Sequence, residues 1–177
     1  MKEKVLVAYA SVYGSTREVA EAVAMTLSET RLTVDLQPVQ KVKSLGEYGA
    51  VVLGAPIYLG VMHKDMQEFL SQHQEELTER PPVIFALGPL SLDEKEWQDA
   101  RATLDKELAK LVWLTPLTME MFGGKYNPAK LRFAHRLITS LPASPLHGVP
   151  AKDIRDWVAI SAWANSLAMK FLVASPQ

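Results

Sequence analysis

The sequence contains no cysteine among its 177 residues. This absence excludes disulfides, thiolate nucleophiles, iron–sulfur clusters and cysteine-based zinc sites. No apolar run reaches the roughly 20 residues that a membrane-spanning helix needs, and no stretch rich in glycine, serine or proline divides the chain. We therefore expect one domain over residues 1–177, a cytoplasmic location, and redox chemistry only through a bound cofactor.

Strong net charge is also missing. The formal net charge is −1 and the isoelectric point is about 6.4, so no global field attracts the chain to nucleic acid. The four histidines are scattered without the spacing of metal ligands. We predict no metal site and no catalytic side chain, because a bound cofactor would carry the chemistry itself.

Buried strands and amphipathic helices alternate along the first 124 residues. Continuous apolar runs at 5–10, 50–53 and 83–87 indicate buried parallel strands, 32–39 alternates like a strand near a sheet edge, and a further element covers 115–122. Apolar residues at helical spacing predict helices over 17–28, 64–77, 93–110 and 152–173. This order predicts a doubly wound α/β sheet, whose ligand site lies beyond the carboxyl ends of the strands.

The turn after the first strand has the chemistry of an anion site. Its residues, 11–16, supply hydroxyl groups and one glycine, and the turn has no carboxylate before Glu18. The N–H groups at a helix N-terminus point outward and the helix dipole favours negative charge there, so a phosphate can bind. Ser15 and Glu18 have the spacing of a capping box. Taken alone, such a turn is more often an ordinary strand-to-helix connection with a good cap.

Other phosphate-binding motifs are missing. The G-x-x-x-x-G-K-[ST] loop of nucleoside triphosphatases and the dinucleotide motif G-x-G-x-x-G do not occur here. A phosphoacceptor receiver domain would need carboxylates where this chain has Ala10-Ser11 and Leu53-Gly54. What remains is a site that binds a monophosphate through hydroxyls and amides, with two further glycine- and proline-containing loops at 54–60 and 88–90 that could hold a flat ring.

These three segments resemble the flavin-binding loops of flavodoxins. Ser11-Val12-Tyr13-Gly14-Ser15-Thr16 resembles the phosphate loop [ST]-x-[TSY]-G-x-[TS], 54–60 resembles the first isoalloxazine loop, and 88–90 falls where the second should be. The resemblance covers about residues 1–124. It implies a flavodoxin-like five-stranded parallel sheet of order 2-1-3-4-5, and FMN as the cofactor. The residues that it implies in cofactor binding are Ser11, Val12, Tyr13, Gly14, Ser15, Thr16, Pro56, Ile57, Tyr58, Leu59, Gly60, Leu87, Gly88, Pro89 and Leu90.

The resemblance also implies roles for these residues. Hydroxyls and amides of 11–16 would bind the phosphate, Tyr58 would stack on the ring, and backbone groups of 87–90 would meet its pyrimidine edge. Gly60 could let a peptide flip toward the reduced ring, because its φ is unrestricted. The alternatives are an ordinary partly exposed aromatic at Tyr58 and a plain turn glycine at Gly60.

Within the flavodoxin-like superfamily the chain is most similar to the protoporphyrinogen IX dehydrogenase group. The shared features are an insert at about 125–150, Gly54-Ala55, His63 and Asp156-Trp157. That group typically has Ser-Ile-Arg-Tyr-Gly where this chain has 56–60, so the similarity indicates the flavin more firmly than the substrate. It implies an FMN-dependent oxidoreductase acting on a flat organic molecule such as a quinone or porphyrinogen. A non-enzymatic electron carrier between proteins is the alternative, and an interaction module without cofactor is a third.

The insert is basic. Lys125, Lys130, Arg132 and Arg136 occur without an acidic residue, among apolar residues that predict an amphipathic helix over 126–141. Such a helix more often covers the core of its own domain and presents its charges to water. It could also make a peripheral contact with an anionic membrane surface or a quinone-reducing partner there.

Overall fold

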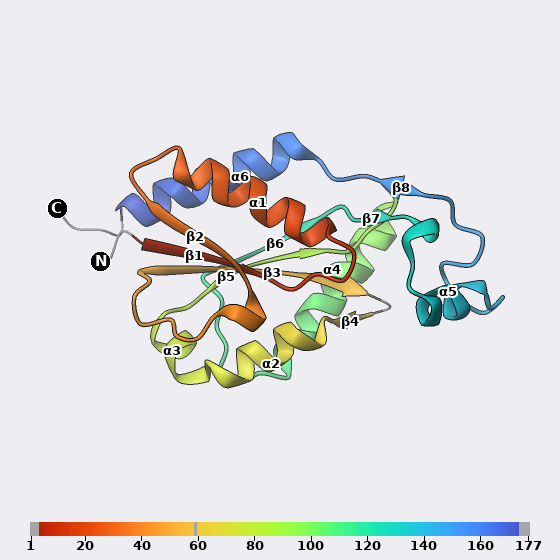
Figure 1. Ribbon diagram of the computed structural model, residues 1–177, viewed down its shortest axis with the longest axis horizontal. Helices are drawn as coiled ribbons and strands as arrows, with labels where there is room; N and C mark the ends of the chain where they lie inside the picture. The colour runs from red at the N-terminus through yellow and green to blue at the C-terminus, as the bar shows by residue number, and fades with distance from the viewer. Residues whose placement is uncertain (1–3, 59, 174–177) are drawn as a thin grey trace.

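The computed structural model describes residues 4–58 and 60–173, without the side chain of Tyr58. Within these residues, parallel strands form a central sheet of order β2-β1-β3-β5-β6 (Figure 1). Their bounds are β1 Lys4–Tyr9, β2 Thr33–Pro38, β3 Ala50–Tyr58, β5 Val83–Leu87 and β6 Thr118–Phe122. The predicted order 2-1-3-4-5 is confirmed, since the additional strand β4, Val61–Met62, is a short antiparallel extension of β3.

Helices cover both faces of this sheet, as Figure 1 shows. One face carries α1 Ser15–Ser28 and α6 Trp157–Val173, and the other carries α2 Lys64–Gln72, α3 Gln74–Glu79 and α4 Glu94–Ala109. Successive side chains of a strand point to opposite faces. Val5 and Val7 of β1 therefore pack in the core under α1 and α6, while Leu6 and Ala8 pack in the core on the opposite face.

The first and the last helix follow the predicted periodicity, except at Trp157. The apolar face predicted for the first helix is fully buried: Val19, Ala20, Val23, Ala24 and Leu27. The predicted face of the last helix is buried from Ile160 onward, but Trp157 is 42% exposed. Its ring instead lies against the guanidinium of Arg155, with 4.6 Å between the guanidinium carbon and the ring centroid.

Several predicted boundaries are wrong by a few residues, for local reasons. The helix predicted over 64–77 divides at His73, whose backbone leaves helical geometry and whose imidazole contacts Glu76 at 2.7 Å. The loop predicted from Gly54 begins as strand, because β3 continues to Tyr58 and pairs with β4. The last helix begins at Trp157 rather than at Lys152, because Lys152 belongs to a strand.

The insert contains short elements rather than one long helix. These are β7 Lys125–Tyr126, the single 3₁₀ turn η2 Pro128–Lys130, α5 Phe133–Ser140 and β8 Lys152–Asp153, and β7 pairs antiparallel with β8. Another 3₁₀ turn, η1 Val39–Lys41, follows β2. The helix predicted over 126–141 is therefore too long, since the backbone at Leu131 and Arg132 is extended.

The basic insert covers little of the core. Tyr126 and Leu131 are buried, but Phe133 is 82% exposed and Leu137 is 58% exposed. The expectation that the apolar face of this segment packs inward thus fails for α5. No helix between residues 4 and 173, leaving out residue 59, is long and apolar enough to cross a membrane.

Candidate functional site

A cavity of about 620 Å³ lies beyond the carboxyl ends of the strands, where the turns after β1, β3 and β5 meet the insert. The predicted site residues that line it are Val12, Tyr13, Ser15, Thr16, Pro56, Ile57, Gly60, Leu87, Gly88, Pro89 and Leu90. Ser11 and Gly14 support the first turn from behind and are not in the wall. Leu59 and the side chain of Tyr58 lie outside the described residues, so ring stacking by Tyr58 stays a prediction.

The turn between β1 and α1 is held by its own backbone. Gly14 has a φ of 88°, a conformation that glycine adopts without strain, and its N–H donates to the Ser11 hydroxyl at 2.9 Å. Gly14 is also the N-cap of α1, so the predicted capping box of Ser15 and Glu18 is wrong. A glycine N-cap brings no side chain to the first-turn N–H groups, which leaves this end of the helix suited to an external acceptor.

Thr16 carries the clearest sign of a ligand. The residue is completely buried, and its hydroxyl is a buried side-chain polar group that has no hydrogen-bond partner within the described part of the chain. An unpaired buried hydroxyl costs about 1–3 kcal/mol, so such groups are rare and call for an explanation. Thr16 lines the cavity at the head of α1, which is the N-terminal end of this helix. A phosphate oxygen there would accept a hydrogen bond from its hydroxyl. The residues present thus fit a phosphorylated cofactor.

Tyr13 connects this turn to the insert. Its hydroxyl accepts the N–H of Arg132 at 3.2 Å and contacts Nδ1 of His135, whose ring lies edge-on at 5.8 Å between centroids. The sequence reasoning placed this hydroxyl among the phosphate donors. In the structure it contacts the insert, and Tyr13 also lines the cavity, so its contact with the phosphate stays a prediction.

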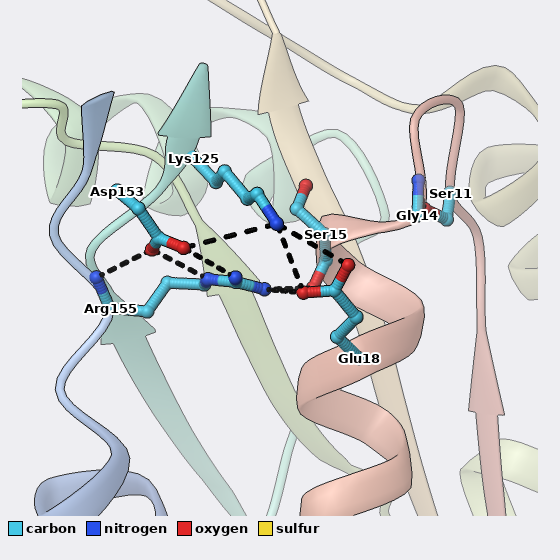
Figure 2. A network of polar contacts seen from close by, with 7 residues as sticks. All are labelled: Ser11, Gly14, Ser15, Glu18, Lys125, Asp153 and Arg155. Carbon is cyan, nitrogen blue, oxygen red and sulfur yellow. Dashed lines mark hydrogen bonds and ion pairs between the residues drawn. The ribbon is translucent and has the colours of Figure 1, made fainter. Parts of the chain in front are cut away.

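A network of charged groups lies beside the head of α1, and Figure 2 shows its members. Nε and Nη2 of Arg155 donate to the two carboxylate oxygens of Asp153 at 2.8 and 2.6 Å, and Nη1 donates to Glu18 at 2.7 Å and to the Ser15 carbonyl at 3.3 Å. Nζ of Lys125 lies 3.3 Å from the Glu18 carboxylate. Glu18 and Lys125 line the cavity, whereas Arg155 and Asp153 stand behind them.

The network shifts the titration of its carboxyl groups. Burial alone raises the pKa of Glu18, but hydrogen bonds and charge from Arg155 and Lys125 outweigh it and hold that pKa below its ordinary value. Hydrogen bonds from Arg155 likewise lower the pKa of Asp153. Both carboxylates are therefore charged at neutral pH, and two cations neutralise them.

The turn after β5 is held by α4 and by the turn after β6. Glu96 accepts the N–H of Leu90 at 2.6 Å and contacts the Ser91 hydroxyl. The N–H of Gly88 donates to the Phe122 carbonyl at 3.2 Å, and Pro89 has no N–H. The N–H groups of Gly88 and Leu90 are therefore engaged within the protein, and the Pro89 carbonyl accepts the N–H of Gly124 at 2.6 Å.

Sequence reasoning missed about half of the cavity wall. One missed group lies on α4: Glu96, Asp99, Ala100 and Thr103. The other follows β6 and includes Gly124, Lys125, Tyr126, Asn127, Lys130, Leu131, Pro145 and Leu146. The motif resemblance ended at residue 124, and no local pattern indicates that the insert folds back over the site. The run of basic residues was the one available signal.

Comparisons with known proteins agree with this arrangement of sheet and site. The family described as "Flavodoxin domain" matches residues 6–149. Flavodoxin 1 from Bacillus cereus has a similar structure, with a TM-score of 0.58 at 15% identity, and 98% of this chain and 99% of that chain are covered. This structural likeness shows the fold, which is flavodoxin-like.

Two relatives carry the name protoporphyrinogen IX dehydrogenase [quinone]. The protein from Escherichia coli K12 is 24% identical over 171 residues, covering 93% of this chain and 94% of its own length. The protein from Leishmania major is 26% identical over 183 residues, covering 98% of this chain and 78% of its own length. These matches confirm the resemblance to this group.

The fold and site together define a flavin-binding oxidoreductase of the flavodoxin type. The chain belongs to the flavodoxin-domain family. The cofactor of this family is FMN, as expected from the three loops, and its electrons pass to small molecules or to redox proteins.

Proposed function

We propose that the cavity holds FMN with its phosphate at the head of α1 and its ring between residues 56–60 and 87–90. The observation that carries this proposal is the buried hydroxyl of Thr16, which has no partner in the described structure and lies in the cavity wall. Thr16, Ser15 and the N–H groups of the first turn would bind the phosphate. Bound FMN would supply the electron transfer itself.

The chain's own residues shape the remaining space. Leu87 and Leu90 form an apolar wall on the side of β5, and Leu131 and Leu146 form another on the side of the insert. These walls exclude water and leave room for a flat apolar molecule against the ring. Backbone groups of 87–90 would meet the pyrimidine edge of the ring.

We further propose that the substrate is a small flat molecule, a quinone or a porphyrinogen, rather than a protein. The supporting observation is that Leu131, Pro145 and Leu146 of the insert line the same cavity as the flavin loops. An electron carrier exposes the edge of its flavin to its partners, whereas this insert would cover that edge of a ring bound as proposed. The names of the two dehydrogenase relatives favour the same class of substrate.

Steady-state turnover tests this proposal. The FMN-loaded protein should oxidise protoporphyrinogen with a water-soluble quinone as acceptor, or reduce that quinone when a flavin reductant is supplied. Leu146→Asp should raise the KM for the quinone, because a carboxylate would enter the apolar wall. Leu137→Asp is the matched control, since Leu137 lies in the same insert but points to solvent. Equal KM values for both variants would favour a non-enzymatic electron carrier. So would a chain that rapidly reduces a protein acceptor but does not reduce the quinone.

The insert also supports a peripheral contact with an anionic membrane. Exposed Phe133 and Leu137 lie on α5, and exposed Leu141 is its C-cap residue. Arg132 precedes this helix and Arg136 lies within it. Apolar side chains beside basic ones suit the boundary between headgroups and acyl chains. Binding to vesicles with anionic lipid should fall with added salt and with Phe133→Ser. Absence of binding, or binding that salt leaves unchanged, would remove this proposal.

A further inference from the structure

The head of α1 carries a carboxylate at the place where an anion is expected. Glu18 lies in the first turn of α1 and lines the cavity together with Thr16. A carboxylate there is favoured by the helix dipole, but it repels any phosphate that binds the same turn. For the turn to accept a phosphate, the charge of Glu18 has to be compensated.

Arg155 supplies this compensation from behind the cavity wall. Its side chain is only 2% exposed, and the residue is not part of the cavity wall. Nε and Nη2 are engaged by Asp153, so the planar guanidinium has one orientation and Nη1 points at Glu18 and at the Ser15 carbonyl (Figure 2). Lys125 is a second cation, with longer contacts of 3.3 and 3.4 Å to Glu18 and a side chain one-third exposed.

We propose that Arg155 is a positioning residue of the phosphate site. It holds the Glu18 carboxylate on the flank of α1 and neutralises it, so that the donors of the first turn face the phosphate without an opposing charge. Asp153 orients Arg155 for this task. This inference rests on the proposed FMN site and makes Arg155 a determinant of preference for phosphorylated flavin, although it does not touch the cofactor.

The test compares two flavins that differ only in the phosphate. Dissociation constants for FMN and riboflavin are measured by flavin fluorescence on the full chain freed of flavin. The riboflavin constant divided by the FMN constant is the ratio that reports the phosphate contribution. Arg155→Gln should lower this ratio about tenfold, or ~1.4 kcal/mol, while riboflavin affinity stays unchanged. Adding Glu18→Gln to that variant should restore most of the ratio, because the uncompensated charge is removed.

Two further variants separate charge from fold. Glu18→Gln alone should raise the ratio above that of the unmodified chain, because it removes the charge that opposes the phosphate. If Arg155→Gln fails to fold, this variant is the test of the proposal. Asp153→Asn keeps Glu18 and Arg155 but weakens the contacts that orient the guanidinium, so it should lower the ratio by less than Arg155→Gln does. An unchanged ratio in this variant would refute the orienting role of Asp153.

The outcomes distinguish this inference from the proposed function. If the unmodified chain binds FMN no better than riboflavin, the phosphate site is wrong and both proposals fail. If the unmodified chain prefers FMN but Arg155→Gln keeps the full ratio, or Glu18→Gln lowers it, only the role of Arg155 is refuted. A loss of riboflavin and FMN affinity in equal measure would show a general structural role and would also refute it.

Discussion

Replacing Thr16 by valine should change stability and cofactor binding in opposite directions. Valine has nearly the same shape as threonine, and Thr16 is completely buried, so the substitution removes the hydroxyl without opening a cavity. An unpaired buried hydroxyl costs about 1–3 kcal/mol. For a chain of this size each kcal/mol moves the melting temperature by roughly 2–4 °C. The flavin-free variant should therefore melt at least about 2 °C higher than the unmodified chain.

The same substitution removes a donor to the phosphate. A hydrogen bond to a charged group contributes about 1.5–3 kcal/mol, so FMN should bind roughly 10- to 100-fold more weakly to the variant. Riboflavin, which has no phosphate, should bind as before. The assays are thermal melts of the flavin-free chain, monitored by circular dichroism, and fluorescence titrations with both flavins.

Thr26→Val is the matched control for this experiment. Thr26 lies on the same helix and is also buried, but its hydroxyl already donates to the Ala22 carbonyl at 3.1 Å. The control variant should gain no stability, and its FMN affinity should equal that of the unmodified chain. A Thr16→Val chain that melts lower than the unmodified chain, or that binds FMN equally well, would refute the argument that this hydroxyl donates to a bound phosphate.

Three further predictions concern the surroundings of the site. Gly54→Ala should lower the melting temperature clearly, because a Cβ there would lie 2.1 Å from Cζ of Phe85, and overpacking costs about 1–3 kcal/mol. Glu96→Gln should weaken FMN binding several-fold, because the acceptor that holds the Leu90 N–H loses its charge. Asp153→Asn should be destabilising at pH 7 in urea melts, and the difference should shrink as the pH falls below 3.8. The pKa of Asp153 is lower in the folded chain, so its contribution is present above the unfolded value and is lost as the pH falls through the folded one.

Two of these predictions have a matched control variant. Gly46→Ala should have little effect, since its Cβ would meet only the Ser44 hydroxyl at an ordinary 3.5 Å. Glu94→Gln, on the exposed face of α4, should leave FMN binding unchanged. Three results would contradict the corresponding reasoning: equal losses in melts of the two glycine variants, FMN affinities that do not separate the two glutamate variants, or a stability difference for Asp153→Asn that does not shrink as the pH falls below 3.8.

The sheet could be predicted from sequence because buried parallel strands leave a strong local signal. Residues 5–10 and 83–87 are continuous apolar runs, and the structure buries Val5, Leu6 and Phe85 almost completely. The three turns at the carboxyl edge follow from the sheet order, since parallel strands end at the same side. Their meeting around one cavity is therefore a consequence of topology rather than of any single motif.

The insert could not be predicted in the same way. Its strands β7 and β8 have two residues each, too few for a periodicity, and they pair across the whole insert. The role of Arg155 depends on contact with Glu18, which is 137 residues away in sequence. The capping box was wrongly predicted for a related reason. Its spacing is present, but Glu18 binds Arg155 and Gly14 is the N-cap residue of α1.

The pairing of β7 with β8 brings the two ends of the segment 127–151 side by side. A loop with adjacent ends can grow or shrink at small entropic cost, because each doubling of its length adds only about 0.6 kcal/mol. The β7–β8 pair therefore lets the covering segment, residues 127–151, evolve separately from the sheet. A lineage could exchange one covering segment for another, and with it the shape of the space above the flavin, while the electron-transfer scaffold underneath stays the same.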